Sequence, residues 1–245
     1  MRTGPALQKG PPRFSTATAA ALRERYLRPA RSASGALELS TYGLDALVGF
    51  EIGSRAWYLQ RLTTPHWPGG ESGVTVGIGY DLGYQSMAQL RADWLDVLGD
   101  AAIARLAAAL GVTGARAKSL VAQLTDLRIG LDEAAAVFYQ STLPRYARRT
   151  STTYPAAGTL PPDATSMLVS LVYNRGSRLT GDSRREMRAI RGQSEARDLP
   201  AIAQSLRSMK RLWPTLRGLV RRREREAEIV EQSDRAYSAA ELVWI

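Results

Sequence analysis

The stretch "LVGFEIGSRAWYLQRLTTPHWPGGESGVTVGIGYDLGY", residues 47–84, decides the expected fold, because its pattern changes from helix to strand around one acidic residue. Leucine, valine and phenylalanine recur at helical spacing up to Gly53, so Glu51 falls in the last turn of an apolar helix. Residues 55–60 and 73–79 favour strands, since the first segment carries aromatic residues and the second alternates Val, Thr and Ile with Gly. Turn residues fill the gap between them, and we therefore expect a small, irregular β-hairpin or sheet.

The rest of the chain has a helical pattern. We expect further helices at 86–99, 100–111, 114–127, 131–149, 163–175, 182–192, 198–212 and 216–238. A small sheet beside a mainly helical bundle is an α+β arrangement.

The N-terminal segment differs from the rest in composition. Residues 1–14 are rich in Pro and Gly and predict a mobile tail, and residues 15–28 predict a short helix capped by Ser15 or Thr16. A linker follows at residues 30–40. We therefore divide the chain into an N-terminal tail with a short helix, residues 1–40, and a main domain, residues 41–245.

The composition excludes several kinds of chemistry. The chain of 245 residues is 44% hydrophobic, which suits a large globular domain. It has no cysteine, so disulfides, thiolate metal sites and thiol nucleophiles are excluded. Its one histidine, His66, is predicted to be an exposed loop residue and cannot build a zinc site that needs several histidines. We expect no metal site, and acid–base chemistry falls to carboxylates.

The net charge of +10 favours an anionic partner, either nucleic acid or an anionic cell envelope. Much of the excess lies in the N-terminal segment and in "RGLVRRRERE", residues 217–226, whose interleaved acids predict a solvated helix face. The N-terminus lacks the apolar core of a secretion signal, and no run of about 18 apolar residues predicts a membrane helix.

Two carboxylates have the unlike surroundings that acid and base roles require. A glycosidase needs one protonated carboxylic acid, which calls for partial burial, and a second group that activates water. Glu51 follows apolar residues on its helix and suits the acid. Asp81 follows a strand and a turn, where a carboxylate can face solvent and remain ionised.

The ordered set of motifs resembles a known group of enzymes. "FE" at residues 50–51, "SGVTVGIGYDLG" at 72–83 and "MLVSLVYNRGS" at 167–177 occur in one order, followed by "SMKRLW" at 208–213 and "GLVRRREREAEI" at 218–229. Together they resemble the phage-type lysozymes and, more closely, the pesticin-like muramidases, over roughly residues 40–235.

The resemblance implies a lysozyme-like fold and a role for individual residues. Glu51 matches the general acid, and Thr75 matches the threonine that holds the attacking water. Asp81 lies six positions after Thr75, where pesticin-like members carry the second carboxylate, and Glu71 is the alternative. Tyr80 stands where many phage enzymes have His, and we expect it, with Glu71, to contact substrate.

The implied reaction is hydrolysis of the β-1,4 bond between N-acetylmuramic acid and N-acetylglucosamine, with inversion and without a metal or organic cofactor. Asn174 and Arg175 are expected to bind substrate at the far wall of the cleft. The same "YNRG" can instead be a helix C-cap with Gly176 after the last turn. Trp213 is predicted to be a core residue, because it lies on an apolar helical stripe.

The implied partners are peptidoglycan glycan strands, with no nucleic acid and no stable membrane insertion, and an immunity or delivery protein as a further partner. The protein would act on the bacterial cell wall, in the periplasm or outside the cell, after delivery by a phage-type or secretion-type route. Three alternatives stay open: a lytic transglycosylase that uses Glu51 alone, a non-catalytic envelope-binding module, and a basic nucleic-acid-binding module.

Overall fold

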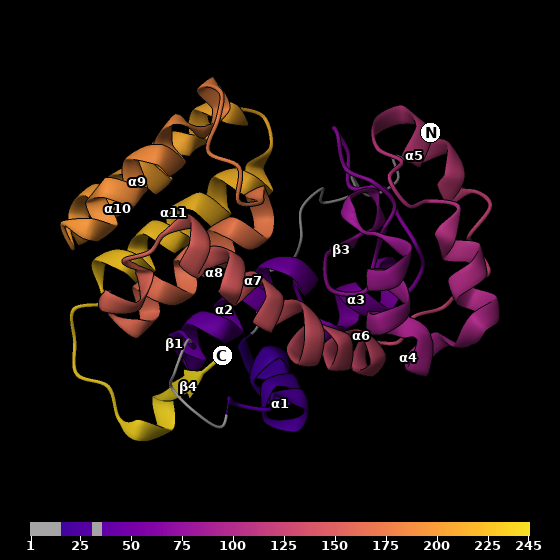
Figure 1. Cartoon of the computed structure of the whole chain (residues 1–245), viewed down its shortest axis with the longest axis horizontal. Helices are drawn as coiled ribbons and strands as arrows, with labels where there is room; N and C mark the ends of the chain where they lie inside the picture. The colour runs from indigo at the N-terminus through magenta and orange to yellow at the C-terminus, as the bar shows by residue number, and fades with distance from the viewer. Residues whose placement is uncertain (1–15, 31–35) are drawn as a thin grey trace, which may run out of the picture.

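The computed structural model describes residues 16–30 and 36–245, and most of these residues are helical (Figure 1). In chain order the elements are α1 (Thr16–Tyr26), β1 (Glu38–Ser40), α2 (Thr41–Ile52), α3 (Arg55–Arg61), β2 (Thr75–Val76), β3 (Tyr80–Asp81), η1 (Leu82–Tyr84), α4 (Met87–Ala107), α5 (Gly114–Val121), α6 (Leu131–Val137), η2 (Phe138–Thr142), α7 (Leu143–Thr153), η3 (Ala157–Thr159), α8 (Pro162–Arg175), η4 (Asp182–Arg184), α9 (Arg185–Glu195), α10 (Leu199–Ser208), η5 (Met209–Leu212), α11 (Arg217–Glu231), η6 (Ala239–Glu241) and β4 (Leu242–Trp244). The predicted α+β class, mainly helical with little sheet, is confirmed. The predicted tail, the cap at Ser15 and linker residues 31–35 lie outside the described residues.

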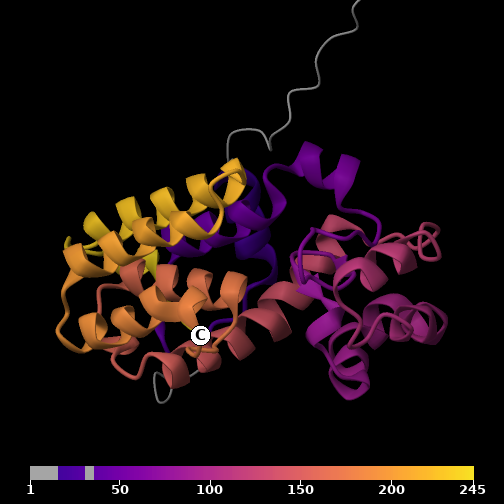
Figure 2. The same cartoon turned by 90° about the horizontal axis from the view of Figure 1, so that it is seen from above.

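The elements form two lobes, as Figures 1 and 2 show. One lobe holds α1, α2, α8 to α11 and the β1–β4 pair, and the other holds the β2–β3 hairpin with α3, α4 and α5. α6, η2 and α7 follow one another from residue 131 to residue 153 and run between the lobes. A site at the boundary can therefore take residues from both lobes.

Only part of the strand predicted at 73–79 is found, as β2, which pairs with β3 in a hairpin. Its strands pair antiparallel, with Thr75 opposite Asp81. Gly77 and Gly79 make the turn with φ of 58° and 67°, the left-handed region that glycine adopts without steric cost. The glycines thus shorten the predicted strand into a tight turn that brings Thr75 and Asp81 side by side.

The strand predicted at 55–60 is wrong, because these residues form helix α3. The Ser54 hydroxyl accepts a hydrogen bond from the backbone N–H of Trp57 at 3.1 Å and caps the first turn. Tyr58 is buried and donates its hydroxyl to the carbonyl of Ile129 at 3.2 Å. Capping and tertiary packing therefore override the β propensity of the aromatic residues.

The other predicted helices are found, with differences at their ends and junctions. The helices predicted at 86–99 and 100–111 are joined in α4, which kinks at Gly99 with φ of 75°. The helix predicted at 131–149 reaches Thr153 and contains the π-helical segment η2. The end of the predicted linker is the short strand β1, in which Leu39 pairs with Val243 of β4.

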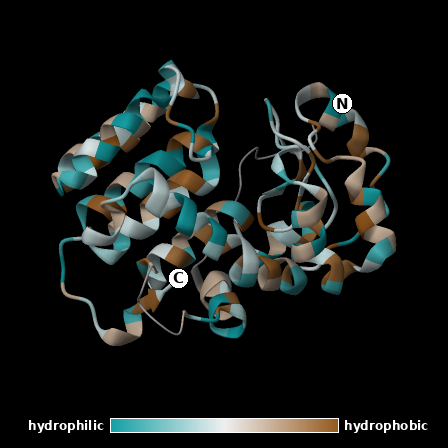
Figure 3. Ribbon diagram, in the orientation of Figure 1, coloured by the Kyte–Doolittle hydropathy of each residue, from teal (hydrophilic) through white to brown (hydrophobic). Residues whose placement is uncertain are grey.

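The core lies between the helices of each lobe and extends to α1. Figure 3 shows hydrophilic and hydrophobic residues alternating along the helices, as expected for helices with one side against a core. α1 packs on α2 and α6, and its Arg23 pairs with Asp45 of α2 at 2.8 Å. Residues 16–26 therefore belong to the same packed body as the main domain.

Candidate active site

Glu51 lies in the last turn of helix α2, at the boundary between the lobes. The helix begins at a Ser40 cap, whose hydroxyl accepts from the N–H of Gly43 at 2.9 Å, and ends before Gly53, whose φ is 66°. The Glu51 side chain is 16% exposed, and its Oε1 accepts a hydrogen bond from Arg222 Nη1 of α11 at 2.6 Å. Glu51 is thus the partly buried helix-end carboxylate that the sequence predicts, held by a side chain that the sequence did not indicate.

The turn of the β2–β3 hairpin packs directly on Glu51. A Cβ atom placed on Gly79 would lie 2.8 Å from Glu51 Oε2, so any other residue would force the carboxylate or the turn to move. Tyr173 of α8 donates its hydroxyl to the carbonyl of Ile78 in the same turn. Two elements of the larger helical lobe, α2 and α8, therefore fix the hairpin beside the carboxylate.

Thr75 and Asp81 face each other on the hairpin. Asp81 accepts hydrogen bonds from the N–H of Gly73 at 3.0 Å and of Gly83 at 2.8 Å. Burial raises the pKa of Asp81, and the two backbone hydrogen bonds partly offset that rise. Thr75 is 5% exposed, and its hydroxyl is 3.4 Å from the carbonyl oxygen of Gly73, a long hydrogen bond. The structure thus brings together the two groups that the resemblance assigns to the attacking water.

Tyr146 of α7 is influenced by the charges of both carboxylates. Burial raises the pKa of its hydroxyl, two arginines of its own helix oppose that rise, and the charges of Asp81 and Glu51 add to it. The Tyr146 hydroxyl is therefore within electrostatic range of both carboxylates. Its ring lies 4.7 Å from that of Tyr173. Sequence reasoning missed Tyr146, since an aromatic residue on an amphipathic helix carries no signal of a site.

The "RGLVRRRERE" segment is only in part the solvated helix face that was predicted, because Arg217 and Arg221 are exposed while three of its charged residues are buried. Arg223 and Glu226 are fully buried and Arg222 is 7% exposed. Glu226 Oε1 accepts from Arg222 at 3.1 Å, from Arg223 at 3.0 Å and from the Ser170 hydroxyl of α8 at 2.6 Å. Each buried charge has an ion-pair partner and at least one hydrogen bond, which offset part of the cost of burial, and the network fixes the arginine that holds Glu51.

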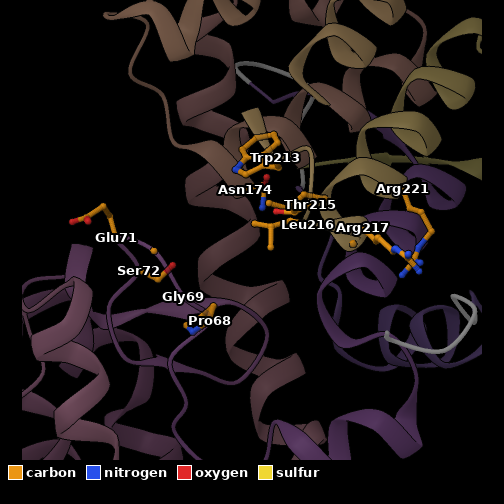
Figure 4. Close-up of a pocket in the computed structure, with 13 residues that line it drawn as sticks. Pro68, Gly69, Glu71, Ser72, Asn174, Trp213, Thr215, Leu216, Arg217 and Arg221 are labelled. Carbon is orange, nitrogen blue, oxygen red and sulfur yellow. The ribbon is translucent and has the colours of Figure 1, made fainter. Parts of the chain in front are cut away.

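An open cleft of about 870 Å³ lies between the lobes near this network (Figure 4). It is lined by Pro68, Gly69, Gly70, Glu71 and Ser72 of the loop before β2, and by Asn174, Trp213, Thr215, Leu216, Arg217, Gly218, Leu219 and Arg221 of the helical lobe. Glu51 is not among the lining residues. It is connected to the cleft through α11, where Arg221 lines the cleft and the next residue, Arg222, binds Glu51.

Two predicted substrate-binding residues line this cleft from opposite sides. Glu71 is exposed, and its backbone carbonyl accepts from the Tyr84 hydroxyl at 2.9 Å. Asn174 lies in the last turn of α8, and its Oδ1 accepts from Arg223 at 3.1 Å. Glu71 does not lie on the paired strands of the hairpin, and its carboxylate lacks the backbone hydrogen bonds that hold the carboxylate of Asp81. The Glu71 side chain is therefore held less firmly.

Arg175 lies behind the cleft wall. Its guanidinium stacks on the Trp213 ring at 4.6 Å and donates to the carbonyl of Ser183 at 2.6 Å. Burial and neighbouring arginines, Arg184 first, lower the pKa of Arg175 to about 10. Gly176, with φ of 71°, ends the helix as the alternative interpretation of "YNRG" expects. Arg175 is therefore a support for Trp213 and does not line the cleft.

Trp213 has a mixed environment, and the prediction of a core residue needs correction. Its side chain packs on the core but is only half-buried, and it lines the cleft. The apolar stripe that suggested a core position ends at Trp213, because η5 ends at the preceding residue and the chain turns before α11.

Two further expectations do not agree with the structure. Tyr80 is 3% exposed, its hydroxyl donates to buried Asp93 at 2.8 Å, and its position does not support contact with substrate. His66 is half-buried and exchanges backbone hydrogen bonds with Thr75 at 2.8 and 3.0 Å, so the exposed-loop prediction is wrong. Burial lowers the pKa of His66. Both residues support the hairpin, which a pattern of turn residues could not reveal.

Residues 16–30 and 36–245 contain no group of three or more His, Cys, Asp or Glu side chains that could hold a metal ion. None of the helices in this described part is long and apolar enough to cross a membrane.

The profile of a protein family described as a domain of unknown function, DUF8812, matches residues 47–151. The matched segment begins in α2 and ends in α7, so it contains Glu51, the hairpin and Tyr146 but neither α8 nor α11. No curated protein matches the chain.

Proposed function

We propose that the protein is a peptidoglycan hydrolase, a muramidase with a lysozyme-like fold that cleaves the β-1,4 bond between N-acetylmuramic acid and N-acetylglucosamine. The observation that carries the proposal is the meeting of Glu51 with the hairpin of Thr75 and Asp81 beside an open cleft. A helical lobe and a small β-containing lobe around such a site are compatible with a lysozyme-like fold.

In this proposal Glu51 is the general acid. Oε1 is held by Arg222, and no residue in the described part of the chain donates a hydrogen bond to Oε2, the oxygen next to Gly79. Glu51 protonates the bridging oxygen as the glycosidic bond breaks. The charged partner Arg222 remains to stabilise the carboxylate that this step produces.

Asp81 and Thr75 serve the attacking water. Asp81 accepts a proton from the water while the Thr75 hydroxyl orients it, and attack from the face opposite Glu51 inverts the anomeric centre. Inverting enzymes hold their two carboxyl groups about 6.5–9.5 Å apart to admit this water. Glycan strands of the bacterial cell wall are the proposed partner, reached in the periplasm or from outside the cell. A phage-type or secretion-type route would deliver the protein, and an immunity or delivery protein would be a further partner.

A lytic transglycosylase is the second candidate, and one observation favours it. The Asp81 carboxylate accepts hydrogen bonds from the N–H groups of Gly73 and Gly83. A carboxylate with a purely structural role would be bonded in the same way. A transglycosylase needs Glu51 alone and forms anhydro-sugar ends without water.

Digestion of purified sacculi, followed by mass analysis of the soluble muropeptides, tests the proposal. Reducing N-acetylmuramic acid ends are the expected result. Anhydro ends would establish the second candidate, and reducing N-acetylglucosamine ends would place cleavage at the other glycosidic bond. Intact glycan would contradict both candidates and leave a non-catalytic envelope-binding or nucleic-acid-binding module.

A further inference from the structure

Arg217 and Arg221 are set apart from the other arginines of α11. Arg222, Arg223 and Arg225 each pair with a glutamate at 3.1 Å or less. For Arg217 and Arg221 the described part of the chain provides no ion-pair partner. These two are also the arginines that line the cleft.

The same pairing extends to the basic residues that precede α11. Arg207 and Lys210 share Glu224, and Arg211 pairs with Glu186. Several cations next to α11 are thus neutralised by acidic side chains of the same lobe, whereas the two arginines of α11 that line the cleft are not. An unneutralised pair of guanidinium groups in a cleft is a surface suited to an anion.

The geometry puts the two cations on one wall. A spacing of four residues places Arg217 and Arg221 on the same face of α11, and Figure 4 draws both on the same side of the cleft. Leu216, 53% exposed, and Trp213 add apolar surface beside them. The carboxylate of Glu71 lies on the other wall, so the positive wall and the acidic wall are separate.

We propose that Arg217 and Arg221 bind a carboxylate carried by the glycan substrate, and that this contact makes the enzyme prefer acidic glycan to neutral glycan. The proposal rests on the proposed function. Neutral sugars offer hydroxyl and acetamide groups, which do not need a cation, whereas a guanidinium matches the two oxygens of a carboxylate. In intact peptidoglycan the carboxylates belong to the peptide stems, and in peptide-free strands they belong to the lactyl groups of N-acetylmuramic acid.

The test measures binding to the full-length Glu51→Gln protein, which separates binding from cleavage. The three probes are a neutral chitooligosaccharide, a peptide-free N-acetylglucosaminyl-N-acetylmuramic acid oligosaccharide, and the same saccharide with peptide stems. Each is titrated calorimetrically into the protein with and without Arg217→Gln and Arg221→Gln. A control carries Arg116→Gln and Arg191→Gln, two exposed arginines outside the cleft lining, and loses the same charge.

We expect the cleft variant to bind acidic probes roughly 10- to 100-fold more weakly, as for loss of charge-assisted hydrogen bonds, while chitooligosaccharide binding stays within about twofold. A loss confined to the peptide-bearing probe assigns the stem carboxylates, and a loss confined to the peptide-free acidic probe assigns the lactyl carboxylate. A loss with both acidic probes shows that the two arginines accept a carboxylate of either kind. Equal losses for all three probes, or equal losses in the control protein, would overturn the inference. If the wild-type protein digests sacculi but the cleft variant binds the acidic probes as tightly as its parent, this inference is refuted and the proposed function stands. Sacculi left intact by the wild-type protein would refute the proposed function.

Discussion

Glu51 and Asp81 are held in place in opposite ways. Glu51 is bonded through Oε1 to Arg222, which lies 171 positions away in the chain, on a helix of the same lobe. Asp81 is bonded to the backbone of Gly73 and Gly83, within eight residues of itself. One carboxylate depends on the tertiary fold, and the other on the local path of a hairpin.

The two carboxylates should therefore respond differently to substitutions elsewhere in the chain. A side-chain tether such as Arg222 can be lost by a single distant substitution, whereas the backbone bonds of Asp81 persist as long as the hairpin forms. The hairpin is fixed to Glu51 by the close approach of Gly79 and by the Tyr173 hydroxyl on Ile78. The two carboxylates can therefore be perturbed separately, which the following predictions use.

The largest effect is expected for Glu51→Gln. The amide can still accept the Arg222 hydrogen bond, so the fold should remain, but it cannot donate the acidic proton. Loss of a general acid costs about 10²–10⁴-fold in rate. Clearing of purified sacculi measures the rate, and thermal melting checks the fold. Near wild-type clearing with unchanged melting would remove Glu51 from the mechanism.

Asp81→Asn should cause the next largest loss of lysis, with a smaller loss for Thr75→Ala. An amide keeps one acceptor oxygen for the Gly73 and Gly83 N–H groups but cannot take a proton from water. Glu71→Gln is the matched control, because Glu71 is an exposed carboxylate on the cleft wall. Rates are compared at matched melting temperatures. A larger effect at Glu71 than at Asp81 would give Glu71 the role of second carboxylate.

Gly79→Ala should reduce activity more than it reduces stability. The added Cβ would lie 2.8 Å from Glu51 Oε2 and force the carboxylate or the turn to move. A misplacement of about 1 Å can cost roughly 10²-fold in rate. Gly99→Ala is the control, since Gly99 also has positive φ, 75°, but no heavy atom within 4 Å of its added Cβ.

Both substitutions place an alanine at a positive φ, which costs on the order of 1–3 kcal/mol. Chemical unfolding should therefore show a loss of stability in both variants, while only Gly79→Ala loses lysis beyond that cost. Equal activity losses in the two variants would show that the contact of Gly79 with Glu51 has no functional consequence.

The smallest effect concerns the pH dependence of stability. Burial raises the pKa of Asp81, so the folded protein favours its protonated form more than the unfolded chain does. Its favourable contribution is complete below the unfolded pKa, about 3.9, and is lost as the pH rises through the folded pKa. The unfolding free energy of wild type minus that of Asp81→Asn should therefore fall over this pH range. A difference that rises with pH would contradict the raised pKa.

The same contrast explains what could be predicted from the sequence. The end of α2 at Gly53 and the glycine turn follow from local patterns, which also mark Glu51 and Asp81 as carboxylates in unlike surroundings. The preference for Asp81 over Glu71 as second carboxylate came from the resemblance. Local propensity failed at residues 55–60, where a Ser54 cap and the buried Tyr58 produce a helix.

Long-range pairing was not predictable. Arg222 and Glu226 lie in a charged run that is typical of solvent exposure, and only contact with Glu51 and Ser170 explains their burial. Tyr146 lies within range of both carboxylates only because α7 runs between the lobes. No pattern within one segment carries this information.

The central claim is that Glu51 and the hairpin together direct water onto a glycosidic bond. Digestion of purified sacculi in oxygen-18 water, with mass analysis of the released muropeptides, tests it most directly. We expect one solvent-derived oxygen-18 at each new reducing end with the wild-type protein, and no released muropeptides with Glu51→Gln. Released fragments that lack the label, or equal release by the Glu51→Gln protein, would contradict it.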